Sequence, residues 1–97
     1  QRAISTLNHA LVAVRSVPQT FYLLGESYGD IGRFDLASVA YQEALKIDSG
    51  FAEAWFGMGR AYVRLGRSAE AGEVVRVLER LNPRLAKELA AGLSERK

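Results

Sequence analysis

The sequence predicts an all-α fold, a solenoid of helical hairpins with about six helices. Three observations lead to this prediction. Helix breakers divide the chain into segments of similar length. Between the breakers, apolar residues recur at helical spacing, and we find no alternating strand pattern. A motif of glycines and a tyrosine recurs after 34 residues, and a fixed period of this size is typical of stacked helical hairpins.

Six segments are expected to form helices, each with an apolar stripe along one face. They span residues 3–16, 18–31, 34–47, 52–65, 69–81 and 84–93. Pro18 and Pro83 suit helix starts, where a missing N–H group costs nothing. Asp35 and Ser68 are the expected N-cap residues of their helices.

Two stretches carry the repeated motif, FYLLGESYGDIG at 21–32 and WFGMGRAYVRLG at 55–66. A Cβ would push the two helices of a hairpin apart, so we expect Gly25 and Gly59 at their closest approach. Gly32 and Gly66 are expected to end their helices in the left-handed conformation. The motif therefore accounts for four glycines, whereas Gly29 and Gly57 have no such explanation.

The two copies resemble the tetratricopeptide repeat (TPR) family, whose pattern is W-x2-L-G-x2-Y, then A-x3-F, then P. The later copy has Trp55-x2-Met58-Gly59-x2-Tyr62, Ala71-x3-Val75 and Pro83. The earlier copy has Phe21-x2-Leu24-Gly25-x2-Tyr28 and Ala37-x3-Tyr41. The resemblance implies a single right-handed solenoid domain over residues 1–97. Its expected parts are the second helix of a partial repeat at 1–17, repeats at 18–51 and 52–83, and a capping helix at 84–97.

Composition and motifs indicate a non-catalytic protein. The absence of cysteine excludes disulfides, thiolate zinc sites and a cysteine nucleophile. His9 is the sole histidine, so we expect no catalytic group, cofactor site or metal site. A net charge of +2 without a basic stripe argues against nucleic-acid binding, and no apolar run approaches the ~20 residues of a membrane span.

The resemblance also implies a binding surface, because first helices of TPR hairpins line a concave groove where partner proteins bind. The side chains expected to bind a partner there are Tyr22, Glu26, Asp30, Phe56, Arg60, Val63 and Arg64. Tyr22 and Phe56 are aromatic residues at equivalent positions, and exposed aromatics often anchor interfaces. The alternative is that they merely cover neighbouring side chains. The capping helix is expected to add Lys87, Ala90 and Ser94.

The charges of this groove allow two hypotheses. Glu26 aligns with Arg60 and Asp30 aligns with Arg64, so two lateral ion pairs are one expectation. In the other, Arg60 and Arg64 hold an acidic partner segment or a C-terminal carboxylate. One TPR subgroup grips acidic chaperone tails, but Glu26 would repel such a tail.

The beginning of the chain suggests a second surface. Residues 1–16 lack a hairpin partner, so Ile4, Leu7 and Leu11 are expected either to mediate a homodimer or to have lost an upstream helix. The chain begins at Gln1, and we expect it to be part of a longer protein. A cytoplasmic location is the expectation, and the preference for arginine over lysine hints at a bacterial gene.

Overall fold

The computed structural model describes residues 17–95, and this part of the chain is helical with short turns. Residues 17–30 form the first described helix. It is followed by α2 (Phe34–Ile47), α3 (Ala52–Leu65), α4 (Ser68–Leu81) and α5 (Pro83–Glu95). The all-α prediction is confirmed. The expected helix at 3–16, with Ile4, Leu7, His9 and Leu11, lies outside the described residues.

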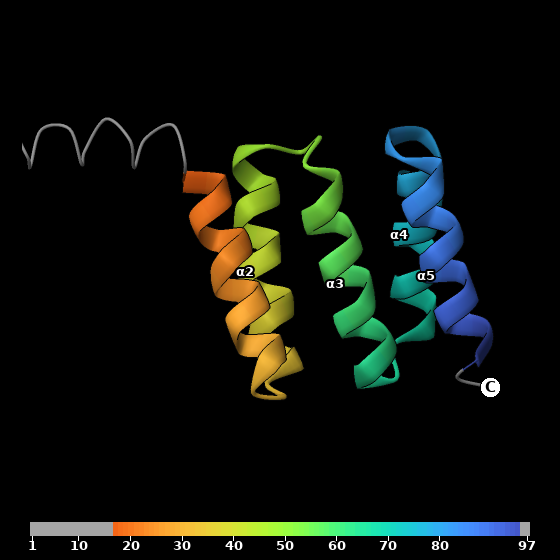
Figure 1. The fold of residues 1–97 in the computed structure, drawn as a ribbon, viewed down its shortest axis with the longest axis horizontal. Coiled ribbons are helices and arrows are strands. Elements are labelled where there is room, and N and C mark those ends of the chain that lie inside the picture. The colour runs from red at the N-terminus through yellow and green to blue at the C-terminus, as the bar shows by residue number, and fades with distance from the viewer. Residues whose placement is uncertain (1–16, 96–97) are drawn as a thin grey trace, which may run out of the picture.

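The helices form two layers (Figure 1). The 17–30 helix, α3 and α5 lie toward the viewer, and α2 and α4 lie behind them. Successive helices from α2 to α5 pack against one another, and α3 also contacts α5 directly. The result is two hairpins followed by one further helix, which is the arrangement of a helical-hairpin solenoid.

Both hairpins turn in the same way at the glycine that recurs after 34 residues. Gly32 has φ 83° and Gly66 has φ 80°, so both residues are left-handed, as predicted. The N–H of Arg33 donates to the Tyr28 carbonyl at 2.9 Å, and the N–H of Arg67 donates to the Tyr62 carbonyl at 2.8 Å. These bonds close the helix ends in the manner of a Schellman motif, so the 34-residue period extends to backbone geometry.

The predicted N-caps Asp35 and Ser68 are wrong. Arg33 and Arg67 hold the cap positions without a side-chain cap hydrogen bond, because each glycine turn leads directly into the next helix. Asp35 lies instead in the first turn of α2, where the Arg33 side chain holds the pKa of its carboxyl below the usual value. Pro83 does begin α5, where Asn82 Oδ1 accepts from the N–H of Leu85 at 3.3 Å.

Small residues let the helices approach closely. A Cβ on Gly25 would lie 2.7 Å from Cε1 of Tyr41 on α2. A Cβ on Gly59 would lie 3.0 Å from Cγ1 of Val74 on α4 and would also meet Leu89 on α5. Contacts this short displace neighbouring atoms, so the predicted role of both glycines is confirmed. The core around them is built from α2 to α5 and includes Ala37, Ala54, Ala71 and Leu78.

Candidate functional site

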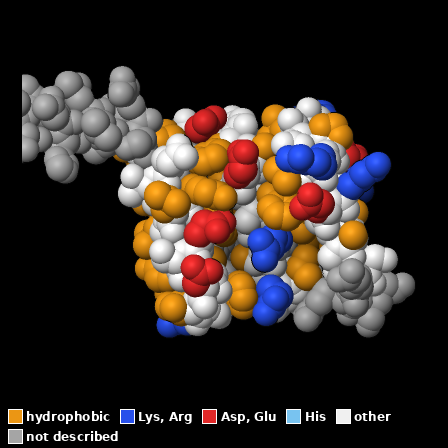
Figure 2. Space-filling view, in the orientation of Figure 1, with side chains coloured by type: hydrophobic (Ala, Val, Ile, Leu, Met, Phe, Trp, Pro, Cys, Tyr) orange, Lys and Arg blue, Asp and Glu red, His pale blue; other side chains and the backbone are white. Residues whose placement is uncertain are grey.

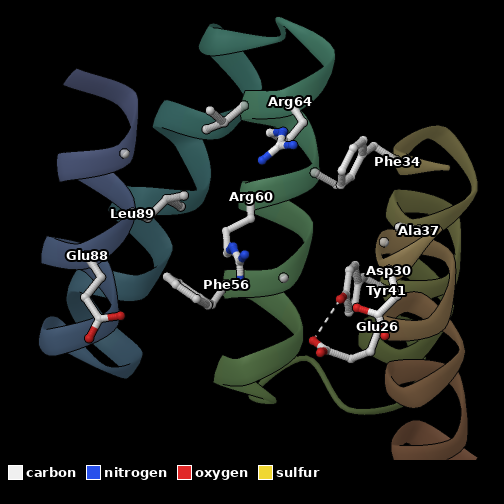
Figure 3. Close-up of a pocket in the computed structure, with 15 residues that line it drawn as sticks. Glu26, Asp30, Phe34, Ala37, Tyr41, Phe56, Arg60, Arg64, Glu88 and Leu89 are labelled. Atoms are coloured by element: carbon white, nitrogen blue, oxygen red, sulfur yellow. Dashed lines mark hydrogen bonds between the residues drawn. The ribbon is translucent and has the colours of Figure 1, made fainter. Parts of the chain in front are cut away.

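A groove of about 680 Å³ opens on the layer that contains the 17–30 helix, α3 and α5. The 17–30 helix contributes Glu26, Gly29 and Asp30. The middle of the groove is formed by α3, through Phe56, Gly57, Arg60, Ala61, Val63 and Arg64. The groove therefore crosses all three helices of this layer, as Figure 3 shows.

The tyrosine ring of α2 forms part of the groove floor. The Tyr41 hydroxyl donates to Glu26 Oε2 at 2.9 Å, and the residue is only 4% exposed (Figure 3). A Cβ on Gly57 would lie 2.7 Å from Cε1 of Tyr41, as a Cβ on Gly25 would. The ring is thus bordered by two glycines from neighbouring hairpins, which explains Gly57. Burial, and then the nearby Glu26 carboxylate, raise the pKa of Tyr41, so the hydroxyl stays a donor.

Two arginines of α3 lie over aromatic rings at the groove. The guanidinium carbon of Arg64 lies 4.9 Å from the centroid of the Phe34 ring. That of Arg60 lies 5.7 Å from the centroid of the Phe56 ring. Such cation–π contacts restrain a long side chain while keeping its positive charge. Both guanidinium groups therefore present N–H donors to the groove.

The expected lateral ion pairs do not form. Between residues 17 and 95, the structure contains no salt bridge from Glu26 to Arg60 or from Asp30 to Arg64. The aromatic rings hold the two arginines, and the Tyr41 hydroxyl holds Glu26, so three of the four charges have restraints other than an ion pair. This corrects the hypothesis that the groove charges neutralise one another.

Tyr22 is not among the residues that line this groove, unlike its sequence equivalent Phe56. Its ring packs 5.8 Å from the Tyr41 ring and 5.1 Å from the Phe51 ring, measured between centroids. Burial and then the charge of Glu26 raise the pKa of Tyr22. The Tyr22 ring thus covers neighbouring side chains, as the alternative expected, and its role in partner binding stays a prediction. Glu26, Asp30, Phe56, Arg60, Val63 and Arg64 do line the groove.

The capping helix faces the groove in a different register from the one expected. The structure brings Glu88, Leu89 and Gly92 of α5 to the groove rather than Lys87, Ala90 and Ser94. The reason is that α5 follows the last repeat, so no earlier copy of the motif indicates its orientation. Sequence reasoning also missed the α2 residues, which are Phe34, Ala37 and Tyr41. Gly57 was the signal for them, because it leaves space above the Tyr41 ring.

The chemistry available in this groove is that of recognition. Exposed guanidinium and carboxylate groups surround an apolar floor, which suits ion pairs and hydrogen bonds to a ligand. Among residues 17–95, no three His, Cys, Asp or Glu side chains are grouped so as to hold a metal ion. Within the same range, none of the helices has the length and apolar character needed to cross a bilayer.

Comparison with known proteins agrees with the geometry. A family model described as "Tetratricopeptide repeat" matches residues 22–86, about two thirds of the chain, and includes both hairpins except the start of the 17–30 helix. No curated protein matches the sequence. Repeats of this family generally mediate protein–protein interaction and typically form non-catalytic scaffolds. On the extent of this match, the chain belongs to the tetratricopeptide repeat family.

Proposed function

We propose that this protein binds a peptide or helix segment of a partner protein in the groove over the 17–30 helix, α3 and α5. One observation carries the proposal: two restrained arginines and three carboxylates, those of Glu26, Asp30 and Glu88, line one groove, and no salt bridge joins them in the described range. In a structure that served packing alone, oppositely charged neighbours would be expected to pair. Unpaired charges around an apolar floor favour a ligand that supplies the missing partners.

Each groove residue has a distinct proposed role. The Phe56 ring supplies apolar contact, and Val63, which is 9% exposed, adds a second apolar residue of α3 to the groove lining. Arg60 and Arg64 supply hydrogen-bonded anchoring, because a guanidinium presents several donors in a fixed plane. Tyr22 is not assigned a binding role, since its ring packs on Tyr41 and Phe51.

A random peptide library displayed on phage tests this function without assuming a partner. Peptides are selected on the 97-residue chain and then tested for binding to an R60E/R64E variant. An R76E/R80E variant is the matched control, since it reverses two exposed arginines of α4 that do not line the groove. Far-UV circular dichroism establishes that both variants are folded.

Selected peptides are expected to bind the wild type and the α4 variant equally and to lose at least ~10-fold in affinity for the groove variant. Equal binding to all three proteins would refute the groove assignment. If both variants lose affinity for the peptides, the loss reflects the overall charge of the protein and not a binding site in the groove.

A second candidate function is self-association through the outer face of the 17–30 helix. Leu23 and Leu24 are exposed large apolar residues of that helix, and Ile31, in the turn that follows it, is 71% exposed. An exposed apolar patch of this kind marks association surfaces. Light scattering over a range of protein concentrations tests it: a dimer of wild type that an L24E/I31E variant abolishes would support this candidate. Charged substitutions at Leu7 and Leu11, which lie outside the described residues, test whether self-association depends on the segment that precedes this helix.

A further inference from the structure

The part of the groove that lies between the 17–30 helix and α3 has two walls of opposite charge. Glu26 and Asp30 lie on the 17–30 helix, and Arg60 and Arg64 lie on α3. Figure 3 shows these two carboxylates on one side of the groove, the two guanidinium groups toward its middle and the carboxylate of Glu88, from α5, on the opposite side. In Figure 2, acidic side chains gather over the first described helix and basic side chains over α3. A ligand that lies between the 17–30 helix and α3 therefore meets a negative wall and a positive wall together.

Neither wall neutralises the other. Arg64 is held by the Phe34 ring and Arg60 by the Phe56 ring, while Glu26 is held by the Tyr41 hydroxyl. No salt bridge joins the walls in the described range. A uniformly acidic ligand would gain from the arginines and be repelled by the carboxylates, and a uniformly basic ligand would meet the reverse. A ligand that is complementary to both walls must therefore carry positive and negative charges together.

The spacing of the charges matches an extended chain. Each wall places its two charged residues four positions apart on a helix, which is about 6 Å along the axis. Successive side chains of an extended peptide point to opposite sides, and those on the same side repeat about every 6.6 Å. An extended segment that lies between the 17–30 helix and α3 and runs parallel to their axes thus sends alternate side chains to opposite walls, in near register with the protein charges.

We propose that the preferred ligand is an extended segment in which basic and acidic residues alternate. Its lysine or arginine side chains contact Glu26 and Asp30, and its aspartate or glutamate side chains contact Arg60 and Arg64. This proposal rests on the groove being a peptide site, as proposed above, and names the chemical class of its ligand.

Three blocked, fluorescently labelled hexapeptides test the proposal by anisotropy at physiological and at high salt. They are the alternating Lys-Glu-Lys-Glu-Lys-Glu, the composition-matched Lys-Lys-Lys-Glu-Glu-Glu, and hexaglutamate. The alternating peptide is expected to bind the wild-type chain about 10-fold more tightly than the block peptide. High salt should reduce that difference. Equal affinity for the alternating and block peptides, or tighter binding of hexaglutamate, would overturn the proposal.

Charge exchange in the protein provides a second, independent test. The half-exchanged variants E26K/D30K and R60E/R64E each have two walls of one sign and should lose the preference for alternation. The fully exchanged variant E26K/D30K/R60E/R64E should recover it, because the peptide shifts by one residue to face the reversed walls. Circular dichroism checks folding, and the wild-type peptide comparison stands even where a variant unfolds. A full exchange that is folded and shows no preference would also refute the proposal.

The hexapeptide results test the ligand class, whereas the phage library tests whether the groove is a peptide site at all. If library peptides bind in a groove-dependent way but alternation has no effect, the ligand class is wrong and the peptide site stands. If neither the library nor the hexapeptides depend on the groove, both proposals fail.

Discussion

The two hairpins carry the same motif but bury it to different extents. Leu24 of the first hairpin is 41% exposed, whereas Met58, its equivalent 34 residues later, is 5% exposed. The second hairpin lies between α2 and α5, whereas among the described elements only α3 lies beside the first hairpin (Figure 1). Burial of a motif residue is therefore decided by the neighbouring hairpin as much as by its own, as expected for a linear repeat array.

The hairpins also differ at one position that matters for the groove. Tyr41 of the first hairpin aligns with Val75 of the second. The tyrosine ring fills the space that Gly25 and Gly57 leave, and its hydroxyl restrains Glu26. Valine has no hydroxyl to offer, so this restraint is particular to the first hairpin. The position of Glu26 in the groove thus depends on Tyr41, a residue that departs from the family pattern.

Truncation of the equivalent leucine and methionine should separate the hairpins most clearly. Met58→Ala is expected to lower the free energy of unfolding by about 2–4 kcal/mol, because it leaves a cavity in a closed core. Leu24→Ala should cost less than about 1 kcal/mol, because its side chain is already partly in water. Urea denaturation followed by circular dichroism measures both. Equal losses would mean that the outer face of the 17–30 helix is covered in solution.

Alanine in place of the two glycines that border Tyr41 should have the next largest effect. Gly25→Ala and Gly57→Ala each drive a Cβ into a ring that is confined on both sides, at a cost of about 1–3 kcal/mol. Gly72→Ala is the matched control, since a Cβ there meets nothing within 4 Å. That control should gain up to about 1 kcal/mol from helix propensity. Three variants with the same stability would contradict the close approach in the first hairpin.

Removal of the Tyr41 hydroxyl should have the smallest effect at neutral pH. Tyr41→Phe is expected to cost about 1 kcal/mol through loss of the bond to Glu26. The folded-state pKa of Tyr41 is raised, so its contribution is complete below the unfolded pKa of about 10. It is lost as pH rises from that value toward the folded pKa, because the unfolded state ionises first.

Urea midpoints of wild type and Tyr41→Phe at pH 8 and pH 11 measure this effect. Wild type should lose more stability than the variant between these two values. Parallel losses would show that Tyr41 ionises as freely in the folded chain as in the unfolded one.

The sequence was sufficient for the architecture because the motif repeats. The predicted bounds 34–47 and 52–65 coincide with α2 and α3, and the predicted left-handed glycines are confirmed. The N-caps were missed because a glycine turn shifts the helix start toward Arg33 and Arg67, a shift of one or two residues. Helix boundaries are uncertain by that amount when they are inferred from capping residues alone.

The contacts within the site were harder to predict from the sequence than the fold, because they depend on how neighbouring side chains are arranged in space. Alignment of the two repeats paired Glu26 with Arg60. Whether two such side chains form an ion pair depends on the other partners available to each of them. Here aromatic rings contact the arginines, and a tyrosine hydroxyl donates to Glu26. Tyr22 and Phe56 occupy the same repeat position. Of these two rings, however, only that of Tyr22 packs against the ring of Phe51, which lies in the turn before α3. Equivalence in a repeat predicts backbone position, whereas the environment of a side chain depends on the next hairpin.

The most direct test of the central claim, that the groove is the binding site, is a nuclear magnetic resonance titration. Amide chemical shifts of the labelled chain are followed while a library-selected or alternating peptide is added. The account predicts the largest changes at Gly29, Gly57, Arg60 and Arg64, with Arg76 and Arg80 unaffected. Largest changes at Leu23, Leu24 and Ile31 would contradict it and place binding on the outer face of the 17–30 helix.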